Sequence, residues 1–200
     1  MVDDYSTDGT RILLQKLTKQ KKYKIYFHPE NKGKGAAVRT GMRHVAGDII
    51  LVQDADLEYN PEDYSSLLEP IVKGKADVVY GSRFITMRLI LFGKNRTIMP
   101  LHYIGNKMLT LLTSLIYMRK ITDMETGYKV MKLDVVRKLK LRGQRFDFEP
   151  EITAKIIKKG YKIHEVPISF NPRSFKEGKK ITIMDGIKAF YYLLKYRFMD

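Results

Sequence analysis

Three carboxylates in residues 53–58 (Gln-Asp-Ala-Asp-Leu-Glu) are the side chains best placed to do chemistry. They directly follow an apolar run, residues 48–52, that is typical of a buried parallel strand. In an open parallel sheet, ligands bind beyond the carboxyl ends of the strands. Close carboxylates repel one another, and a divalent cation would offset this repulsion while bridging the protein to a diphosphate. The run predicts a metal-assisted site for a phosphorylated ligand, and the alternative is a solvated acidic turn.

Two further segments could bind a nucleotide. Residues 3–10 (Asp-Asp-Tyr-Ser-Thr-Asp-Gly-Thr) place acids at a strand end, where they could hold a ribose or a base, although Ser6, Thr7 and Asp8 could simply cap a helix. Residues 31–37 (Asn-Lys-Gly-Lys-Gly-Ala-Ala) place glycines at the start of a helix, where backbone amides can approach a phosphate. Val38 stands where a dinucleotide-binding pattern needs its third glycine, and there is no Walker A pattern, so neither of those sites is favoured.

The elements that must position these segments alternate between strand and helix along the chain. This alternation predicts an α/β domain built from βαβ units around a mostly parallel central sheet flanked by helices. We expect strands at residues 1–2, 23–27, 48–52, 76–80 and 161–170, and helices around residues 12–17, 36–46, 61–72, 101–118, 148–159 and 183–198. Residues 81–83 (Gly-Ser-Arg) are expected to break the fourth strand, and residues 122–131 to be strand or loop.

Composition narrows the classes of partner and cofactor. The 200 residues are 44% hydrophobic, enough for one domain with a core, and the absence of cysteine excludes disulfides and thiolate metal sites. A formal net charge of +15 favours polyanionic partners such as phosphorylated substrates, anionic lipid or nucleic acid. The longest apolar segment, residues 98–117, carries His102, Asn106 and Lys107, so we expect a buried or interfacial helix there and not a membrane span.

The three segments also carry a family resemblance in their order and spacing. Asp-Asp-x-Ser-x-Asp-Gly-Thr, then Asn-x-Gly-x-Gly-x-Ala, then Gly-Asp-x5-Asp-Ala-Asp-Leu resemble inverting family-2 glycosyltransferases of the GT-A fold. The chain is most similar to the polyprenyl-phosphate branch of that family, which includes the dolichyl-phosphate mannosyltransferases, and the resemblance continues through residues 81–83, 122–129, 146–151 and 166–173. It implies transfer of a sugar, with inversion, from a GDP- or UDP-linked donor to a polyprenyl or dolichyl phosphate at a membrane surface, with Mg²⁺ or Mn²⁺ as cofactor.

The resemblance also implies roles for single acids. Asp56 and Glu58 would hold the metal, and Asp54 would lie beside the nucleotide and the sugar. Glu58 is often Gln in relatives, so it adds a negative charge that bears on metal preference. Asp54, Asp56 and Asp123 form the implied catalytic set, with Asp123 close to the sugar or the acceptor. The implied nucleotide-sugar-binding residues are Asp3, Asp4, Lys34 and Asp54.

A phosphate acceptor changes what the site requires. Because a phosphate monoester is already ionised near neutral pH, it can attack without a general base and needs only positive charge to hold it beside an anionic donor. The resemblance assigns this task to Arg83, Arg96 and Arg173, and the arginine fork suits phosphate oxygens. In a chain with 37 Lys and Arg residues, each could instead be a solvated surface charge.

The last helix bears on where the protein works. Residues 183–198 place Ile187, Phe190, Tyr191 and Leu194 on one side, so this helix could lie in a membrane interface or could close the core. The resemblance favours a peripheral position at the cytoplasmic face of a membrane, where a membrane-anchored partner or an oligomer would fit.

The chain departs from the family pattern at its start. Relatives begin with a further βα unit that carries a Pro-x-Tyr-Asn-Glu-like motif, and nothing here matches it, so we expect residues 1–200 to be one partial catalytic domain without the first strand and helix. An inactive truncated paralogue and a sugar-phosphate nucleotidyltransferase remain alternatives. A basic nucleic-acid-binding module is less favoured, because the basic residues are spread along the whole chain and the acidic strand end opposes nucleic acid.

Overall fold

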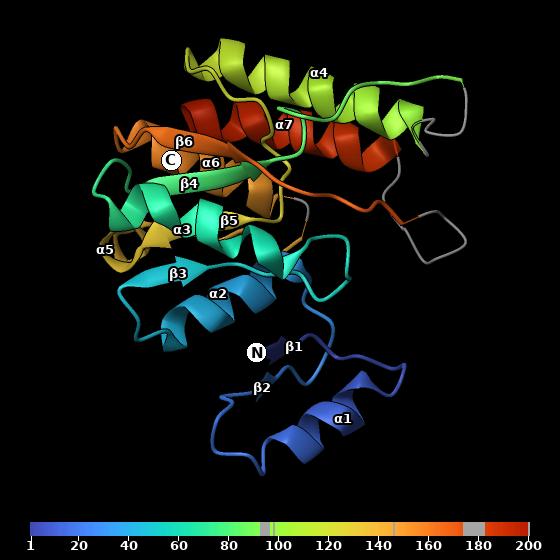
Figure 1. The fold of residues 1–200 in the computed structure, drawn as a ribbon, viewed down its shortest axis with the longest axis vertical. Coiled ribbons are helices and arrows are strands. Elements are labelled where there is room, and N and C mark those ends of the chain that lie inside the picture. The colour runs from blue at the N-terminus through green and yellow to red at the C-terminus, as the bar shows by residue number, and fades with distance from the viewer. Residues whose placement is uncertain (93–96, 98, 146, 174–182, 200) are drawn as a thin grey trace.

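The computed structural model describes residues 1–92, 97, 99–145, 147–173 and 183–199, which form two sheets with helices around them (Figure 1). The N-terminal part is a parallel pair of short strands, β1 (Val2–Asp3) and β2 (Tyr26–Phe27). They are joined through helix α1 (Thr10–Leu17), and helix α2 (Lys34–His44) contacts β1. Figure 1 shows this blue unit below the larger sheet, with α2 lying between the two.

The larger sheet has four strands in the order β3 (Ile49–Leu51), β5 (Lys129–Lys132), β4 (Val78–Ser82) and β6 (Ile163–Pro167). Strand β5 is antiparallel to both β3 and β4, and β4 is parallel to β6. Three of these strands therefore run in one direction and β5 runs against them. The start of β5 consequently lies at the edge where β3 and β4 end, which brings the loops at residues 53–58, 83–92 and 122–128 to one side of the sheet.

One predicted strand end is wrong. Residues Gly81 and Ser82 were expected to break the fourth strand, but they continue β4 and pair with Val166 and Pro167 of β6. A Cβ atom at position 81 would lie 2.7 Å from the Ile168 side chain, so this glycine allows close packing within the sheet. Tertiary pairing here overrides the local turn preference of a Gly-Ser pair.

Helices cover both faces of the larger sheet. Alternate residues of β4 explain this, because Val78 and Tyr80 point into one apolar cluster and Val79 into another. The first cluster is closed by α5 (Leu133–Lys138) and α6 (Phe148–Lys158). The second is closed by α3 (Tyr64–Val72), which a short 3-10 turn at Pro61–Asp63 introduces. Helix α5 was not expected from the sequence.

The outer layer consists of α4 (Pro100–Tyr117) and α7 (Ile183–Phe198), which pack against each other, with α7 also packing on α6 (Figure 1). Tyr117, Leu193 and Tyr196 are buried between them, and the Tyr117 hydroxyl donates to the Leu193 carbonyl at 2.9 Å. Helix α7 therefore does close a core on one side. Among the described residues, none of the helices combines the length and hydropathy that crossing a bilayer requires.

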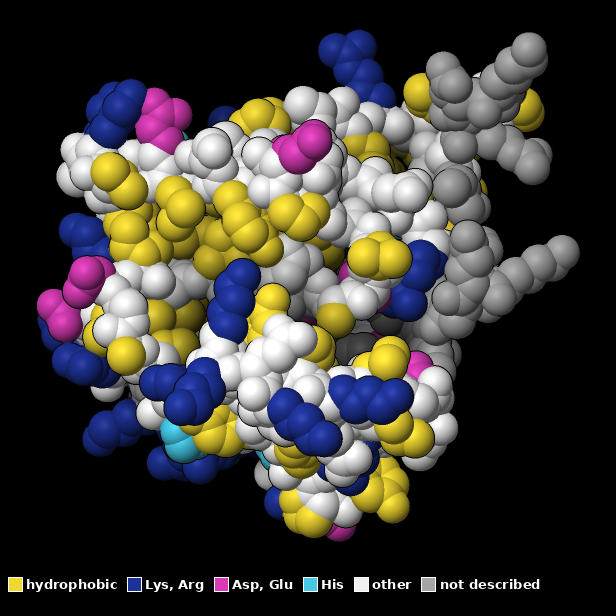
Figure 2. Space-filling view, turned by 60° about the horizontal axis from the view of Figure 1, so that its bottom comes forward, with side chains coloured by type: hydrophobic (Ala, Val, Ile, Leu, Met, Phe, Trp, Pro, Cys, Tyr) yellow, Lys and Arg dark blue, Asp and Glu magenta, His cyan; other side chains and the backbone are white. Residues whose placement is uncertain are grey.

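Charged and apolar side chains are interspersed on the face drawn in Figure 2. A band of hydrophobic side chains runs across the middle of this face, and Lys and Arg side chains gather mainly below it and at its left. The basic charge on this face is broken by apolar surface, unlike the continuous basic track that a bound nucleic acid backbone needs.

Candidate active site

The carboxylates that follow β3 are each paired with a cation from elsewhere in the chain. Asp54 Oδ2 lies 2.7 Å from Lys34 Nζ, and Asp56 Oδ2 lies 3.0 Å from Arg173 Nη2. Glu58 Oε1 accepts the backbone N–H of Arg173 at 2.9 Å. The loop turns tightly at Leu57, which has a left-handed backbone (φ 61), and the Glu58 N–H donates to Asp56 Oδ1 at 3.2 Å. The strand end thus concentrates negative charge that the protein itself neutralises.

Lys34 connects the acidic loop to a buried charge network. Its Nζ lies between Asp54 and Glu149, 3.0 Å from Glu149 Oε1, and Glu149 also pairs with the buried Lys129. Burial works against the charge of Lys34, but the carboxylates of Glu149 and Asp54 outweigh burial and raise the pKa of Lys34 above its usual value. Lys34 is therefore a permanent cation at the first residue of α2.

Asp3 fixes its own segment, and Asp4 joins that segment to residues 31–37. Asp3 is buried, accepts the Ser6 N–H at 3.2 Å and pairs with Arg11 Nε at 2.8 Å. Asp4 accepts the N–H groups of Lys32 at 2.9 Å and Gly33 at 2.7 Å, just before α2 begins. The segments at residues 3–10 and 31–37, both predicted to bind nucleotide, are therefore neighbours. Asp3 and Asp4 already accept hydrogen bonds from backbone N–H groups.

The imidazole of His28 completes this part of the site. Its Nδ1 lies 2.7 Å from Asp4 Oδ1 and its Nε2 lies 2.9 Å from the Thr40 hydroxyl. Both ring nitrogens are thus engaged, which fixes the loop between β2 and α2. Of the expected helix caps, Asp8 accepts the Thr10 N–H at 3.1 Å, whereas the capping position itself is Gly9.

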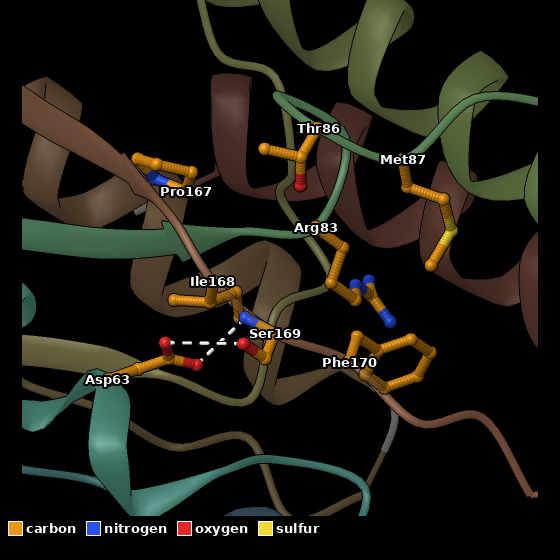
Figure 3. A pocket seen from close by; sticks show the side chains of 8 residues that line it. All are labelled: Asp63, Arg83, Thr86, Met87, Pro167, Ile168, Ser169 and Phe170. Carbon is orange, nitrogen blue, oxygen red and sulfur yellow. Dashed lines mark hydrogen bonds between the residues drawn. The ribbon is translucent and has the colours of Figure 1, made fainter.

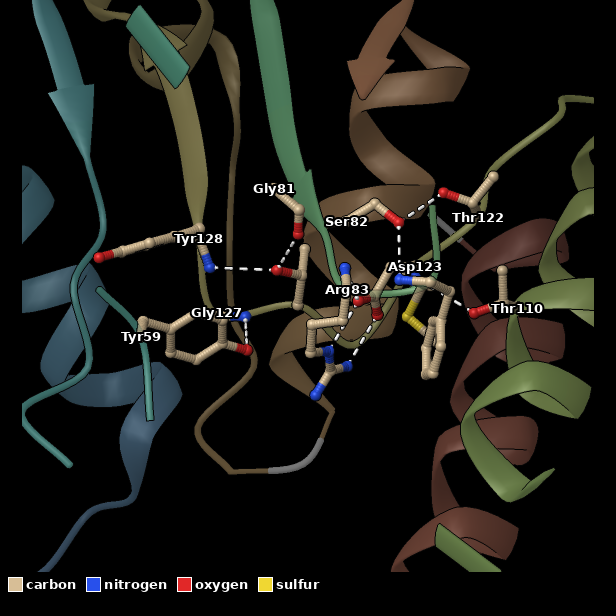
Figure 4. Close-up of polar contacts among 12 residues, drawn as sticks. Tyr59, Gly81, Ser82, Arg83, Thr110, Thr122, Asp123, Gly127 and Tyr128 are labelled. Carbon is tan, nitrogen blue, oxygen red and sulfur yellow. Dashed lines mark hydrogen bonds and ion pairs between the residues drawn. The ribbon is translucent and has the colours of Figure 1, made fainter. Parts of the chain in front are cut away.

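On the other side of the acidic loop, Arg83 and Asp123 form a buried bidentate pair. Arg83 Nε lies 2.7 Å from Asp123 Oδ2, Nη2 lies 2.7 Å from Oδ1, and the Arg83 N–H also donates to Oδ2 (Figure 4). Burial alone would lower the pKa of Arg83, but Asp123 raises it further above its usual value. Asp123 has no exposed surface, so its geometry suits it to fixing Arg83.

The loop at residues 122–127 touches the acidic loop directly. The Gly127 N–H donates to the Tyr59 hydroxyl at 2.8 Å, and Thr126 donates to the Gly81 carbonyl (Figure 4). A Cβ atom at position 127 would lie 2.5 Å from Asp54 Oδ2 and 2.9 Å from the Tyr59 ring. Glycine at this position lets the loop approach the Asp54 carboxylate.

A pocket of about 420 Å³ opens beside Arg83. It is lined by Asp63, Arg83, Thr86, Met87, Pro167, Ile168, Ser169 and Phe170 (Figure 3). The guanidinium of Arg83 lies 5.0 Å from the centre of the Phe170 ring, and Asp63 Oδ2 accepts the Ser169 N–H at 2.8 Å. A fixed cation next to apolar walls suits an anionic group attached to an apolar chain.

The predicted site residues thus fall into three groups. Asp3 and Asp4 lie at the end of β1 in the smaller sheet, and the other two groups lie at one edge of the larger sheet. Asp54, Asp56 and Glu58 join Lys34 and Arg173, whereas Arg83 joins Asp123. Arg96 lies outside the described residues. Sequence reasoning gave no role to Lys129, Glu149, Tyr59 or Glu125, although the resemblance covered the segments that hold Lys129, Glu149 and Glu125.

Two carboxylates could take part in holding a divalent cation. Asp56 and Glu58 both direct an oxygen at Arg173, so a positive group is already held between them, and carboxylate oxygens are the ligands that Mg²⁺ and Mn²⁺ prefer. Within the described part of the chain, no cluster of three or more His, Cys, Asp or Glu side chains could hold a metal. The residues fit a site of the kind in which one or two carboxylates bind Mg²⁺ and substrate phosphates complete the coordination.

Glu125 carries a carboxyl group whose environment disfavours its charged form. Burial, with the nearby charge of Glu149, raises the pKa of Glu125 to about 7, despite Lys129, Arg83 and Lys34. Its Oε1 is buried and has no hydrogen-bond partner in the part of the chain that the structure describes. The folded protein therefore favours protonated Glu125, a contribution to stability that is complete below pH 4.5 and is lost as the pH rises to about 7.

Replacing Glu125 with glutamine should remove this pH dependence. We expect the stability of E125Q relative to the parent to rise by about 2–3 kcal/mol between pH 5 and pH 8, measured by urea unfolding. Glu30→Gln, at an exposed side chain, should leave the pH profile unchanged. Parallel profiles for E125Q and the parent would contradict the raised pKa.

Comparison with known proteins identifies the family of this chain. The family described as "Glycosyl transferase family 2" matches residues 1–140. The chain belongs to glycosyl transferase family 2. Among curated family members, a dolichol-phosphate mannosyltransferase of Pyrococcus furiosus is 30% identical over 202 aligned residues, which cover 98% of this chain and 54% of that protein.

A second family member points to the same branch. A UDP-N-acetylglucosamine–dolichyl-phosphate N-acetylglucosaminyltransferase of Methanococcus voltae is also 30% identical, over 84% of this chain and 66% of that protein. The chain thus spans between about half and two thirds of the length of these two curated relatives.

Solved structures support the fold assignment. The glucosyl-3-phosphoglycerate synthase of Mycobacterium tuberculosis in complex with UDP superposes with a TM-score of 0.68 at 16% identity, over 98% of this chain and 67% of that one. The expected GT-A fold is confirmed, and the two curated relatives are named as transferases that act with dolichyl or dolichol phosphate.

Proposed function

We propose that this chain transfers a sugar from a GDP- or UDP-linked donor to a polyprenyl phosphate, with inversion, at a membrane surface. The observation that carries the proposal is the placement of charge at one edge of the sheet. The acidic loop after β3 lies between Lys34 on one side and Arg173 on the other, and Arg83 faces a partly apolar pocket nearby. The donor diphosphate and the acceptor phosphate would each lie beside a cation at this edge of the sheet.

The donor would lie against the acidic loop and the start of α2. Lys34, the first residue of α2, provides positive charge for a diphosphate. Asp56 and Glu58 would hold Mg²⁺ or Mn²⁺, which neutralises the departing nucleoside diphosphate when bound. The synthase of Mycobacterium tuberculosis that shares this fold has been crystallised with Mn²⁺ and UDP-glucose.

The acceptor phosphate would enter the pocket beside Arg83. Because Asp123 holds the Nε and Nη2 edge of the guanidinium, the arginine keeps one orientation, and its remaining N–H groups would bind the phosphate without first being ordered. The ionised phosphate oxygen then attacks the anomeric carbon directly, and the site needs no general base. Asp123 would act by positioning Arg83.

The outer helices support a membrane surface. Helix α4 exposes Leu101, Ile104, Met108, Leu111 and Leu115, and α7 exposes Met184, Ile187, Tyr191, Leu194 and Phe198. Both sets recur every three or four residues, so each forms a stripe opposite the buried side of its helix. Loop residue Met87, which lines the pocket, accepts a hydrogen bond from Tyr103 of α4 at 3.3 Å, so this apolar layer adjoins the acceptor pocket.

A transfer assay tests the proposal. We would incubate the chain with labelled UDP-N-acetylglucosamine, UDP-glucose or GDP-mannose, polyprenyl phosphate in anionic vesicles, and Mg²⁺ or Mn²⁺. Labelled lipid should form with at least one donor, and polyprenol without its phosphate should not react. Binding of a donor without any transfer would instead identify an inactive relative, and absence of donor binding would refute the proposal. Family membership already argues against the nucleotidyltransferase alternative.

A further inference from the structure

The charge balance around Asp56 and Glu58 depends on a residue from a distant segment. Arg173 Nη2 lies 3.0 Å from Asp56 Oδ2, its backbone N–H donates to Glu58 Oε1 at 2.9 Å, and its Nε lies 3.8 Å from the same oxygen. The guanidinium of Arg173 is thus a cation held by both carboxylates. A divalent ion bound by the same two oxygens cannot share this position with a guanidinium, because both would need the same lone pairs.

The Arg173 contact is built differently from the Arg83 contact. The side chain of Arg173 is 36% exposed and that of Asp56 is 24% exposed, whereas the Arg83 and Asp123 side chains are 8% and 0% exposed. Arg173 Nε is buried without a hydrogen-bond partner among the described residues, so its fork is incompletely used. A partly exposed, incompletely bonded pair is weak, and it can be broken without leaving an isolated buried charge.

Arg173 also belongs to a segment that links the acidic loop to the acceptor pocket. The Asn171 N–H donates to the Glu58 carbonyl at 2.9 Å, and Phe170 forms an isolated bridge with Tyr59. Phe170 and Ser169 line the pocket beside Arg83. Residues 169–173 therefore connect Asp56 and Glu58 to the wall of that pocket.

We propose that Arg173 is an internal substitute for the divalent cation, which holds residues 170–173 on the acidic loop until metal displaces it. Displacement frees the guanidinium toward the neighbouring pocket, where it joins Arg83 as a second cation for the acceptor phosphate. Metal-bound donor would thereby prepare the acceptor site, which gives an order of binding. This inference rests on the proposed function only for the identity of the acceptor, since the competition between arginine and metal requires no transfer.

Mn²⁺ binding to the chain, measured by the electron paramagnetic resonance signal of free Mn²⁺ without any nucleotide, tests the competition. Arg173→Met removes the charge at similar length and should bind Mn²⁺ about fivefold more tightly, the factor that corresponds to an ion pair of about 1 kcal/mol. Arg173→Lys should stay close to the parent. Arg119→Met, at an exposed position just after the end of α4, changes the net charge equally and should not tighten binding. Equal affinities for R173M, R119M and the parent would overturn the proposal.

A second measurement follows the segment in protein with Arg173 intact. The chain contains no cysteine, so Asn171→Cys at an exposed position gives a unique site for a fluorescent label. Mg²⁺ should change the label's emission, and the additional change Asp56→Asn should abolish the response. No response to saturating Mg²⁺ in the labelled parent would also overturn the proposal. Neither Mn²⁺ binding nor the label's emission requires sugar transfer. A failed transfer assay would therefore leave this inference standing, and a failure here would leave the proposed transfer standing.

Discussion

Asp123→Ala should lower the free energy of unfolding by about 3–5 kcal/mol, because it leaves the Arg83 guanidinium buried without a counter-charge. Arg83 and Asp123 are 7% and 0% exposed and are joined by two bonds of 2.7 Å, so loss of the carboxylate leaves a largely buried guanidinium without its counter-charge. Urea unfolding of the purified chain measures the loss. A change below 1 kcal/mol would show that the pair does not anchor this edge of the sheet.

Two further variants separate stability from function at this pair. Arg83→Met with Asp123→Leu removes both charges together and should recover most of the lost stability, since an apolar pair of similar volume can replace a buried ion pair. It should not recover acceptor binding if Arg83 holds the phosphate. Glu69→Ala breaks an exposed helical pair with Lys73 and should leave the free energy of unfolding almost unchanged, which makes it the matched control.

Asp56→Ala should reduce sugar transfer on the order of a thousandfold while leaving the fold intact. The carboxylate is proposed to hold the metal that neutralises the leaving diphosphate, so its loss raises the barrier of the chemical step. Stability should change little, because the only cation paired with it, Arg173, is 36% exposed within the described structure. The measurement is initial rate of labelled lipid formation at saturating donor.

Asp77→Ala is the matched control for this variant. Asp77 pairs with Lys132 at the surface, and its side chain is 49% exposed, so removing it makes the same change of charge away from the acidic loop. Its transfer rate should equal that of the parent. Full activity in Asp56→Ala would refute the metal assignment and leave Glu58 or another group to neutralise the diphosphate.

Local patterns predicted the elements whose burial is periodic. Helix α7 was expected at residues 183–198 and lies there, because its apolar positions repeat at the helical period. The place of the acidic loop also followed from sequence, since a carboxylate run after a buried strand must lie at the sheet edge. Helix α5 escaped prediction because its six residues are too few to show a period.

The partners of the site carboxylates could not be read from sequence. Lys34 precedes Asp54 by twenty residues, but Arg173 follows Asp56 by more than a hundred, and only the folded chain brings them together. Glu149 and Lys129 likewise come from different elements. The sequence predicted which charged residues lie at this edge of the sheet. Which carboxylate pairs with which cation depends on side-chain positions that no local pattern specifies.

The reversed direction of β5 gives the two ends of the sheet unequal tolerance for change. At one end, the turns before β4 and β6 contain Gly74 and Gly160, around which nothing lies within 4 Å of an added Cβ atom. At the other, Gly127 has no such room, since β5 begins there against Asp54 and Tyr59. Insertions and substitutions should therefore be tolerated in the turns at the first end. At the second end, the loops must keep their lengths to preserve the site.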